Sequence, residues 1–261
     1  MAAPENGLKA ALLRGETQIG LWLGFGSPTV AELAAGCGFD WCLVDGEHSP
    51  NDPGDMIAQF RALASGGNSH AIARVPVGEE WVLKRVLDLG VQTVMVPMVE
   101  SAAQARQVAE AMRYPPDGVR GNGAALARAS GYSLTPDYVQ TANAQICTIA
   151  QIESRAAVAA IPEIAAVEGI DVLFIGPADL AADMGYTGQS GVPEVEAVME
   201  EALAAIAAAG KVPGILSFDP EGVARYAALG ARFIGVGADV TSLAGALRSL
   251  SAETRALLPK A

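Results

Sequence analysis

The sequence predicts a (β/α)8 TIM barrel, and three observations lead to this prediction. Short apolar runs alternate with helical patterns eight times along the 261 residues, which is the order expected when helices connect the strands of a closed parallel sheet. Most of these runs are continuously apolar, as strands buried on both faces are. Four of them lead directly into short polar clusters, and such barrels carry their reactive side chains at the C-terminal ends of the strands.

The apolar runs, taken in chain order, are the expected strands: residues 18–23, 41–45, 71–75, 93–97, 147–152, 172–175, 212–216 and 233–236. Between them lie helical patterns at residues 28–37, 79–89, 102–112, 192–209, 220–229 and 241–258. Gly90, Gly210 and Gly230 each end a helical run shortly before the next strand, where a left-handed residue is expected. The turn residues therefore agree with the strand count.

One connection, residues 114–143, is too long for an ordinary loop and is rich in Gly, Pro and Arg. It follows the fourth strand. Connections of this length are more often functional lids or binding loops than spacers. We therefore expect a lid or a binding loop here.

The composition favours one compact domain spanning residues 1–261. Hydrophobic residues make up 51% of the chain and charged residues 18%, so the chain can bury a sizeable core and is not expected to be disordered. The formal net charge of −12 repels phosphate backbones, and no basic stripe offsets it, so nucleic acid is not expected as a partner. The N-terminus has no apolar signal region and no segment is long enough for a membrane span, so we expect a cytoplasmic protein with no membrane association.

The cysteines agree with a reducing compartment. There are three, Cys37, Cys42 and Cys147, each in an apolar run and without C-x-x-C spacing. We interpret them as small buried hydrophobic residues rather than as metal ligands or nucleophiles.

The sequence has only two histidines, and the barrel prediction places them at opposite ends. His70 precedes the third strand, whereas His48 follows the second strand at the reactive end. His48 is thus the imidazole available for acid–base chemistry, and Asp45 could hold one ring nitrogen and fix the tautomer. The alternative is a hydrogen-bonded loop histidine.

Two carboxylates predict a metal site, because Glu153 and Asp179 close neighbouring strands. Two oxygen ligands suit a hard divalent ion that keeps waters and accepts substrate oxygens. We expect Mg²⁺ or Mn²⁺, with Co²⁺ as a third candidate, and not zinc with Cys or His ligands. Asp179 could instead only begin a short helix at residues 177–184.

The segment from Gly176 to Asp179 resembles the start of a helix, so the amides of Ala178 and Asp179 could bind a carboxylate. A metal beside such an anion site indicates a 2-oxo acid as substrate. Arg74, at the end of the third strand, supplies a fixed positive charge that could stabilise an oxyanion or enolate. Its alternative role is a surface salt bridge.

The lysines argue against Schiff-base catalysis, which needs an ε-amine in the barrel mouth. None of the four is expected there: Lys9, Lys84, Lys211 and Lys260. Metal and arginine would then have to stabilise an enolate.

Two further features have simple alternatives. Residues 235–239, Gly-Val-Gly-Ala-Asp, could form a phosphate site, but tight strand-to-helix packing is the simpler interpretation. Glu100 could be an extra metal ligand, but Glu100-Ser101 is more simply the cap of the next helix.

Several motifs in the same order resemble the HpcH/HpaI aldolases, which are metal-dependent class II pyruvate aldolases with barrels of the phosphoenolpyruvate/pyruvate type. The resemblance covers residues 7–250. It rests on the segments 20–24 (GLWLG), 39–41 (FDW), 45–48 (DGEH), 96–98 (VPM), 113–116 (RYPP), 121–128, 151–153 (QIE) and 175–180 (IGPADL).

The resemblance implies a role for each of these side chains. His48 and Asp45 would form a proton-transfer dyad, Glu153 and Asp179 would hold the metal, and Arg74 would contact the oxo group of the donor. The resemblance also implies substrate contacts at Trp22, Gln151, Gly176, Ala178, Asp179 and Leu216.

The resemblance further implies a homo-hexamer in which the last helix, at residues 241–258, packs on a neighbouring subunit. Asn122 and Phe25-Gly26 depart from the familiar pattern, which leaves the preferred acceptor open.

We therefore expect reversible aldol cleavage of a 4-hydroxy-2-oxo acid to pyruvate, or an analogue such as hydroxypyruvate, and an aldehyde. One alternative is a citrate lyase β-like enzyme acting on acyl-coenzyme A, which the absence of an obvious basic set for a nucleotide disfavours. Another is a binding or scaffold protein with a vestigial site.

Overall fold

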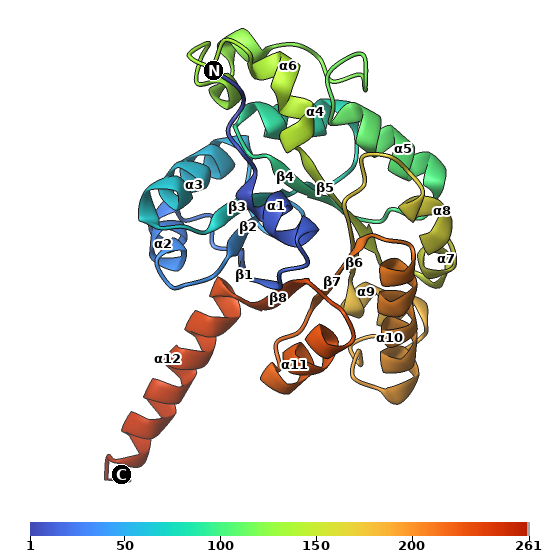
Figure 1. The fold of residues 1–261 in the computed structure, drawn as a ribbon. Helices are drawn as coiled ribbons and strands as arrows, with labels where there is room; N and C mark the ends of the chain where they lie inside the picture. The colour runs from blue at the N-terminus through green and yellow to red at the C-terminus, as the bar shows by residue number, and fades with distance from the viewer. Residues whose placement is uncertain (260–261) are drawn as a thin grey trace.

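The computed structural model describes residues 1–259 and contains a closed barrel of eight parallel strands, which confirms the predicted fold (Figure 1). Each strand pairs with its neighbours in chain order, and β8 pairs with β1. The strands are β1 (Gln18–Leu23), β2 (Trp41–Asp45), β3 (His70–Arg74), β4 (Thr93–Val96), β5 (Cys147–Ile152), β6 (Val172–Ile175), β7 (Val212–Leu216) and β8 (Phe233–Ala238).

The six helices expected from their patterns are present, with ends within two residues of the prediction. Five of them form part of the ring around the barrel in Figure 1, and the last one, α12, projects away from it. Several begin with an oxygen side chain that accepts a backbone N–H, as Ser27 does for α2 and Asp219 does for α11. The α-helices are α1 (Gly7–Leu13), α2 (Pro28–Ala35), α3 (Pro53–Gly66), α4 (Glu80–Asp88), α5 (Ala102–Ala111), α6 (Tyr138–Ala142), α7 (Arg155–Ala159), α8 (Ile161–Ala165), α9 (Pro177–Asp183), α10 (Pro193–Ala208), α11 (Pro220–Ala228) and α12 (Asp239–Ala256).

Aromatic and aliphatic side chains fill the interior of the barrel. Trp41 stacks on Phe233 with ring centroids 4.3 Å apart. Gly20 on β1 makes room for this pair, because a Cβ there would lie 1.9 Å from the Trp41 ring. A second, larger core lies between the strands and the helices.

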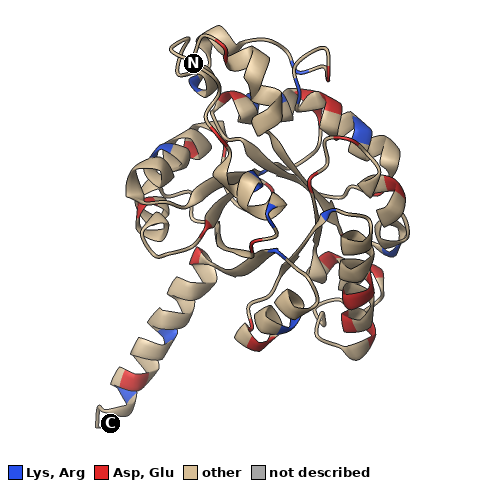
Figure 2. Ribbon diagram, in the orientation of Figure 1, with Lys and Arg blue, Asp and Glu red and all other residues tan. Residues whose placement is uncertain are grey.

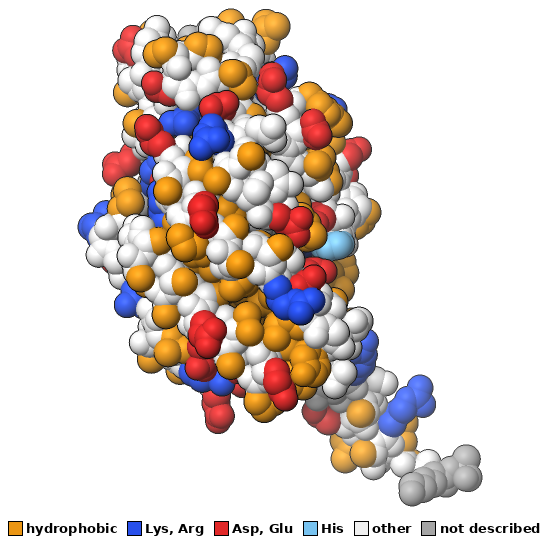
Figure 3. Space-filling model, turned by 90° about the vertical axis from the view of Figure 1, so that its right-hand side faces the viewer, with side chains coloured by type: hydrophobic (Ala, Val, Ile, Leu, Met, Phe, Trp, Pro, Cys, Tyr) orange, Lys and Arg blue, Asp and Glu red, His pale blue; other side chains and the backbone are white. Residues whose placement is uncertain are grey.

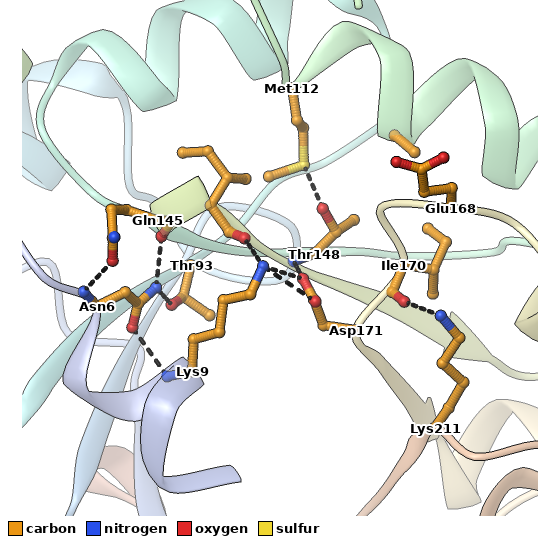
Figure 4. Close-up of polar contacts among 12 residues, drawn as sticks. Asn6, Lys9, Thr93, Met112, Gln145, Thr148, Glu168, Ile170, Asp171 and Lys211 are labelled. Atoms are coloured by element: carbon orange, nitrogen blue, oxygen red, sulfur yellow. Dashed lines mark hydrogen bonds and ion pairs between the residues drawn. The ribbon is translucent and has the colours of Figure 1, made fainter. Parts of the chain in front are cut away.

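Helix α1 closes the N-terminal end of the barrel. Its Leu8 and Leu12 join the interior cluster. Lys9 binds the carbonyl oxygen of Ile146 at 2.6 Å and forms an ion pair with Asp171, and nearby Asn6 contributes further hydrogen bonds (Figure 4). Substrate access is therefore left to the opposite end of the barrel.

The long connection after α5 consists of three short 3₁₀ helices and α6. The 3₁₀ helices are η1 (Ala124–Leu126), η2 (Arg128–Ser130) and η3 (Asn143–Gln145). Arg128 binds the carbonyl oxygen of Leu89 at the end of α4, and Asp137 pairs with the N-terminal amine. The connection thus lies at the N-terminal ends of the strands and does not form a lid over the rim of this chain. The alternative that it is a binding loop stays a prediction.

Helix α12 leaves the barrel and projects away from it (Figures 1 and 3). Asp239, its first residue, is the one buried residue of this helix. Apolar side chains on it are exposed: Val240, Leu243, Leu247 and Leu250. This helix therefore carries an apolar surface that the chain itself does not cover.

Charges are scattered over the structure. In Figure 2, Lys and Arg alternate with Asp and Glu over the described residues and form no continuous basic stripe. In the same part of the chain, no helix combines the length and apolarity needed to cross a membrane.

Candidate active site

The predicted polar clusters do meet at one end of the barrel. Asp45 ends β2 and Arg74 ends β3, and the two residues are register partners across these strands. Glu153 follows β5, and Asp179 lies in the first turn of α9 after β6. Because all these strands are parallel, their C-terminal ends share one rim, as predicted.

Arg74 and Asp45 form a buried bidentate ion pair. The Arg74 Nε and Nη2 atoms each donate to an Asp45 carboxylate oxygen at 2.7 Å. Burial alone would raise the pKa of Asp45, but the hydrogen bonds and charge of Arg74 outweigh burial and lower it. Asp45 is therefore a fixed anion that orients the guanidinium.

The expected contact between Asp45 and the His48 ring is not formed among the described residues, so that part of the dyad prediction is wrong. The His48 side chain is 68% exposed, and its nearest acidic partner is Glu47, with Nε2 3.9 Å from Oε1. The physical reason is competition: Asp45 is already held by Arg74, by the Glu47 amide and by the Ser49 hydroxyl. A permanently charged guanidinium binds a carboxylate more strongly than a neutral imidazole does.

Glu47 belongs to the site, although no role was predicted for it. Its Oε2 atom lies 3.0 Å from Arg74 Nη1. Burial is the main cause that raises its pKa. Strand alternation gives no signal for it, because β2 ends at Asp45 and the chain bends at Gly46 and Glu47.

Glu153 is a buried carboxylate held by two N–H groups. Its side chain accepts hydrogen bonds from the Met98 amide, at 3.0 Å, and from the Gln151 side chain. Met98 has φ of +54°, a left-handed conformation that is uncommon for a residue with a side chain. Burial, with the charges of Asp179 and Glu47, raises the pKa of Glu153 to about 7.

Gly176 brings the start of α9 against Glu153. A Cβ at Gly176 would lie 2.4 Å from Glu153 Oε1, so the close approach requires glycine. Two residues later, Ala178 and Asp179 are exposed at the rim. The Asp179 side chain makes no hydrogen bond or ion pair with the described residues, so it does not serve as a helix cap.

Trp22 and Leu216 lie together on the floor of the site. Both would contact a Cβ at Gly235, at 2.4 and 2.7 Å. The Trp22 ring packs against Phe174, with centroids 5.7 Å apart, and the guanidinium carbon of Arg74 lies 6.0 Å from the Trp22 centroid. The floor is thus apolar, and Arg74 stands above it.

The donor atoms present suit a hard divalent cation. Around the rim stand one guanidinium and four carboxylates, those of Asp45, Glu47, Glu153 and Asp179, and each of these acids except Asp179 is largely buried. Within residues 1–259 no group of three or more His, Cys, Asp or Glu side chains converges as a complete metal site. Glu153 and Asp179 could supply two oxygen ligands to such an ion, which would complete its shell with water or substrate.

Thiol and amine chemistry have no support at this rim. Burial raises the pKa of Cys42 to about 11. Lys9 and Lys211 bind carbonyl oxygens at the N-terminal end, and Lys84 pairs with Glu80 on α4. Lys260 lies outside the described residues. Lys9, Lys84 and Lys211 therefore do not lie at the rim, and catalysis without a Schiff-base lysine stays a prediction.

Two secondary predictions have simpler outcomes. After β8, the Asp239 carboxylate accepts hydrogen bonds from the amides of Gly24 and Phe25, at 2.8 and 3.2 Å. These donors are therefore already bound to an acidic side chain, which disfavours the phosphate site considered at residues 235–239. Glu100 accepts a hydrogen bond from Ser154, and Ser101 caps α5, which supports the capping interpretation of this pair.

Comparison with known proteins shows which proteins the chain resembles. Residues 18–246 match the family described as HpcH/HpaI aldolase/citrate lyase. The chain is 53% identical to the hydroxypyruvate/pyruvate aldolase of Agrobacterium fabrum, over 97% of this chain and 94% of that protein. It is 50% identical to the 4-hydroxy-2-oxo-heptane-1,7-dioate aldolase of Shigella sonnei, over 95% and 94% of the two chains. A solved HpcH/HpaI aldolase/citrate lyase family protein from Burkholderia cenocepacia superposes with a TM-score of 0.92 at 42% identity, covering 96% of this chain and 99% of that one.

Proposed function

Because the chain belongs to the HpcH/HpaI aldolase/citrate lyase family, we propose that it catalyses reversible, metal-dependent aldol cleavage of 4-hydroxy-2-oxo acids. The products are pyruvate, or the analogue hydroxypyruvate, and an aldehyde. One structural observation supports this most: a rim of four carboxylates faces a single guanidinium. Such an excess of negative charge in a partly buried site favours a bound cation.

Glu153 and Asp179 would hold the cation, and Mg²⁺, Mn²⁺ and Co²⁺ all suit carboxylate oxygens. When bound, a divalent ion supplies Lewis-acid chemistry that lowers the free energy of forming an enolate. Met98 and Gln151 orient the Glu153 carboxylate with neutral N–H groups, so its full charge remains available to the ion.

The donor acid would bind between α9 and Arg74. The amides of Ala178 and Asp179 would bind its carboxylate. Gly176, which has no side chain, lets the start of α9 lie close to Glu153. Arg74 would donate to the oxo group, in an orientation that Asp45 fixes. The side-chain oxygen Oε1 of Gln151 is buried without a partner among the described residues, so bound donor or water would satisfy it.

His48 would move the proton between the aldol hydroxyl and solvent. Its exposure at the rim gives the imidazole access to both substrate and bulk water. The acceptor aldehyde would lie towards Leu216, which lines one cavity with Pro177 and Ala178 at the start of α9. The names of the Agrobacterium and Shigella relatives suggest hydroxypyruvate, pyruvate and a four-carbon semialdehyde as the first substrates to test.

Exchange of the pyruvate methyl protons in deuterated water, followed by NMR, tests the proposal. Wild type should exchange them only with a divalent ion present, and Glu153→Ala should abolish this metal-dependent exchange. His48→Ala should lower aldol turnover by roughly 10² to 10⁴ if His48 is the general base. Exchange that persists after both chelation and Glu153→Ala would refute the proposed ligands.

The competing acyl-coenzyme A activity has less support. The rim offers one guanidinium and, in the described residues, no lysine to bind nucleotide phosphates. Stabilisation against heat by pyruvate, but not by acyl-coenzyme A, would separate the two activities.

We also propose that the whole chain forms one barrel domain, and that it assembles as a homo-hexamer through α12. The exposed apolar side chains of this helix support assembly with a second copy. The free cysteines, Cys37, Cys42 and Cys147, support a cytoplasmic location.

A further inference from the structure

Glu47 is the one rim carboxylate to which neither the sequence nor the proposed mechanism gives a role. Its side chain is only 18% exposed and lies between two groups that the reaction uses. One oxygen is 3.0 Å from Arg74 Nη1, and the other is 3.9 Å from His48 Nε2. Taking a carboxylate out of water is costly unless it is paired, so its placement calls for a function.

Asp45 alone leaves part of the guanidinium unsupported. It binds Nε and Nη2, which fixes one edge of the Arg74 plane. Nη1 lies beyond that edge, and the acidic group that contacts it is Glu47. This contact is an ion pair without hydrogen-bond geometry, because Glu47 Oε2 has no hydrogen-bond partner among the described residues. The two carboxylates thus lie on two sides of the guanidinium, one bound by hydrogen bonds and the other by charge, and together they restrain its tilt.

We propose that Glu47 is a positioning residue that fixes the Arg74 guanidinium and the His48 imidazole relative to each other. The inference rests on the proposed function, in which Arg74 contacts the donor and His48 moves the proton. Small displacements of such groups lower reaction rates steeply. Glu47 would then affect turnover more than substrate binding, because both groups must be aligned in the transition state.

Glu47→Gln tests the proposal with little change of shape, and Glu79→Gln is the matched control. Glu47 and Glu79 both line a cavity of about 370 Å³. Glu79, however, is exposed, and its side chain makes no hydrogen bond or ion pair within residues 1–259. We expect Glu47→Gln to lower kcat of metal-dependent pyruvate exchange by about 10- to 100-fold with KM changed less than about threefold. Glu79→Gln should match wild type.

Two further variants separate positioning from a merely structural role. Glu47→Asp keeps the charge on a shorter arm, so it should be faster than Glu47→Gln. In an Arg74→Ala background, Glu47→Gln should cost less than about threefold, because residues that act through one another are not additive. Circular dichroism and thermal unfolding should show that each variant is folded.

The outcomes distinguish this proposal from the proposed function. If wild type shows no metal-dependent exchange, the proposed function fails. If wild type is active but Glu47→Gln equals Glu79→Gln, changes KM alone, or is fully additive with Arg74→Ala, only the role of Glu47 is overturned.

Discussion

Glu153 is the residue whose ionisation the site must control. Its pKa in the folded protein is raised to about 7 from an ordinary value of 4.5, first by burial. The folded protein therefore binds this proton more tightly than the unfolded chain does. Its protonation favours folding below the unfolded pKa of about 4.5, and this contribution is lost as the pH rises towards about 7.

The first prediction follows for the metal-free protein. The free energy of unfolding of wild type, minus that of Glu153→Gln, should fall between about pH 5 and about pH 8, because only wild type must charge this buried site. Urea unfolding of both proteins in chelator measures the difference. A difference that stays constant or rises with pH would show that burial does not raise the pKa of Glu153.

Gly176→Ala gives a second prediction at the scale of one residue. The added methyl would lie 2.4 Å from Glu153 Oε1, and this carboxylate cannot move without losing the hydrogen bonds of Met98 and Gln151. Disturbing the groups that orient a metal ligand typically costs 10- to 100-fold in affinity, so Mn²⁺ affinity measured by calorimetry should fall by about that factor. Gly191→Ala, whose Cβ would meet nothing within 4 Å, is the control and should bind normally. Equal affinities would contradict this account.

Most residues of the rim could be predicted from the sequence, but the contacts between them could not. Asp45, Arg74, Glu153 and Asp179 could be predicted because each follows an apolar run. The partner of Asp45 could not, since it depends on the register of β2 against β3. Distance along the chain favoured His48, three residues away, over Arg74, which is 29 residues away.

Helix α1 shows what could be predicted of the elements. The eight strands could be predicted from continuous apolar runs. The burial of Leu8 and Leu12 could not, because it depends on contacts that form only when the barrel closes. The long connection misled for a different reason: the helix predicted at residues 102–112 already lies between the fourth strand and the connection, so the sequence did indicate that the connection returns to the N-terminal end of the barrel. Elements that form from local patterns were predictable, and those that depend on closure were not.

Asn6→Ala tests the closure by α1. Asn6 accepts the amide of Lys9 as N-cap, and its side-chain amide donates to Thr93 and to the carbonyl oxygen of Gln145 (Figure 4). Loss of the cap and of two further hydrogen bonds, one buried and one partly buried, should lower the free energy of unfolding by about 2 kcal/mol. Turnover should stay near wild type, because the helix lies at the end of the barrel away from the rim. A large loss of turnover without destabilisation would be inconsistent with a closing role.

The shape of the whole molecule predicts assembly. Leu243, Leu247 and Leu250 recur on one side of the projecting helix α12 and are exposed. Leu247→Glu should therefore reduce the mass of the assembly seen by light scattering after size exclusion. Ala252→Glu, about half a turn away from this face on the same helix, should leave the mass unchanged. Assembly that survives Leu247→Glu would show that this face is not the interface.

The arrangement of charge across the whole rim carries the functional account, since four carboxylates meet one guanidinium at the end of the barrel that α1 leaves open. The most direct test is anomalous diffraction from crystals soaked with Mn²⁺ and pyruvate. The account predicts one strong anomalous peak between Glu153 and Asp179, with pyruvate density beside Arg74. A map with no peak there, or with Mn²⁺ bound only at another site, would contradict it.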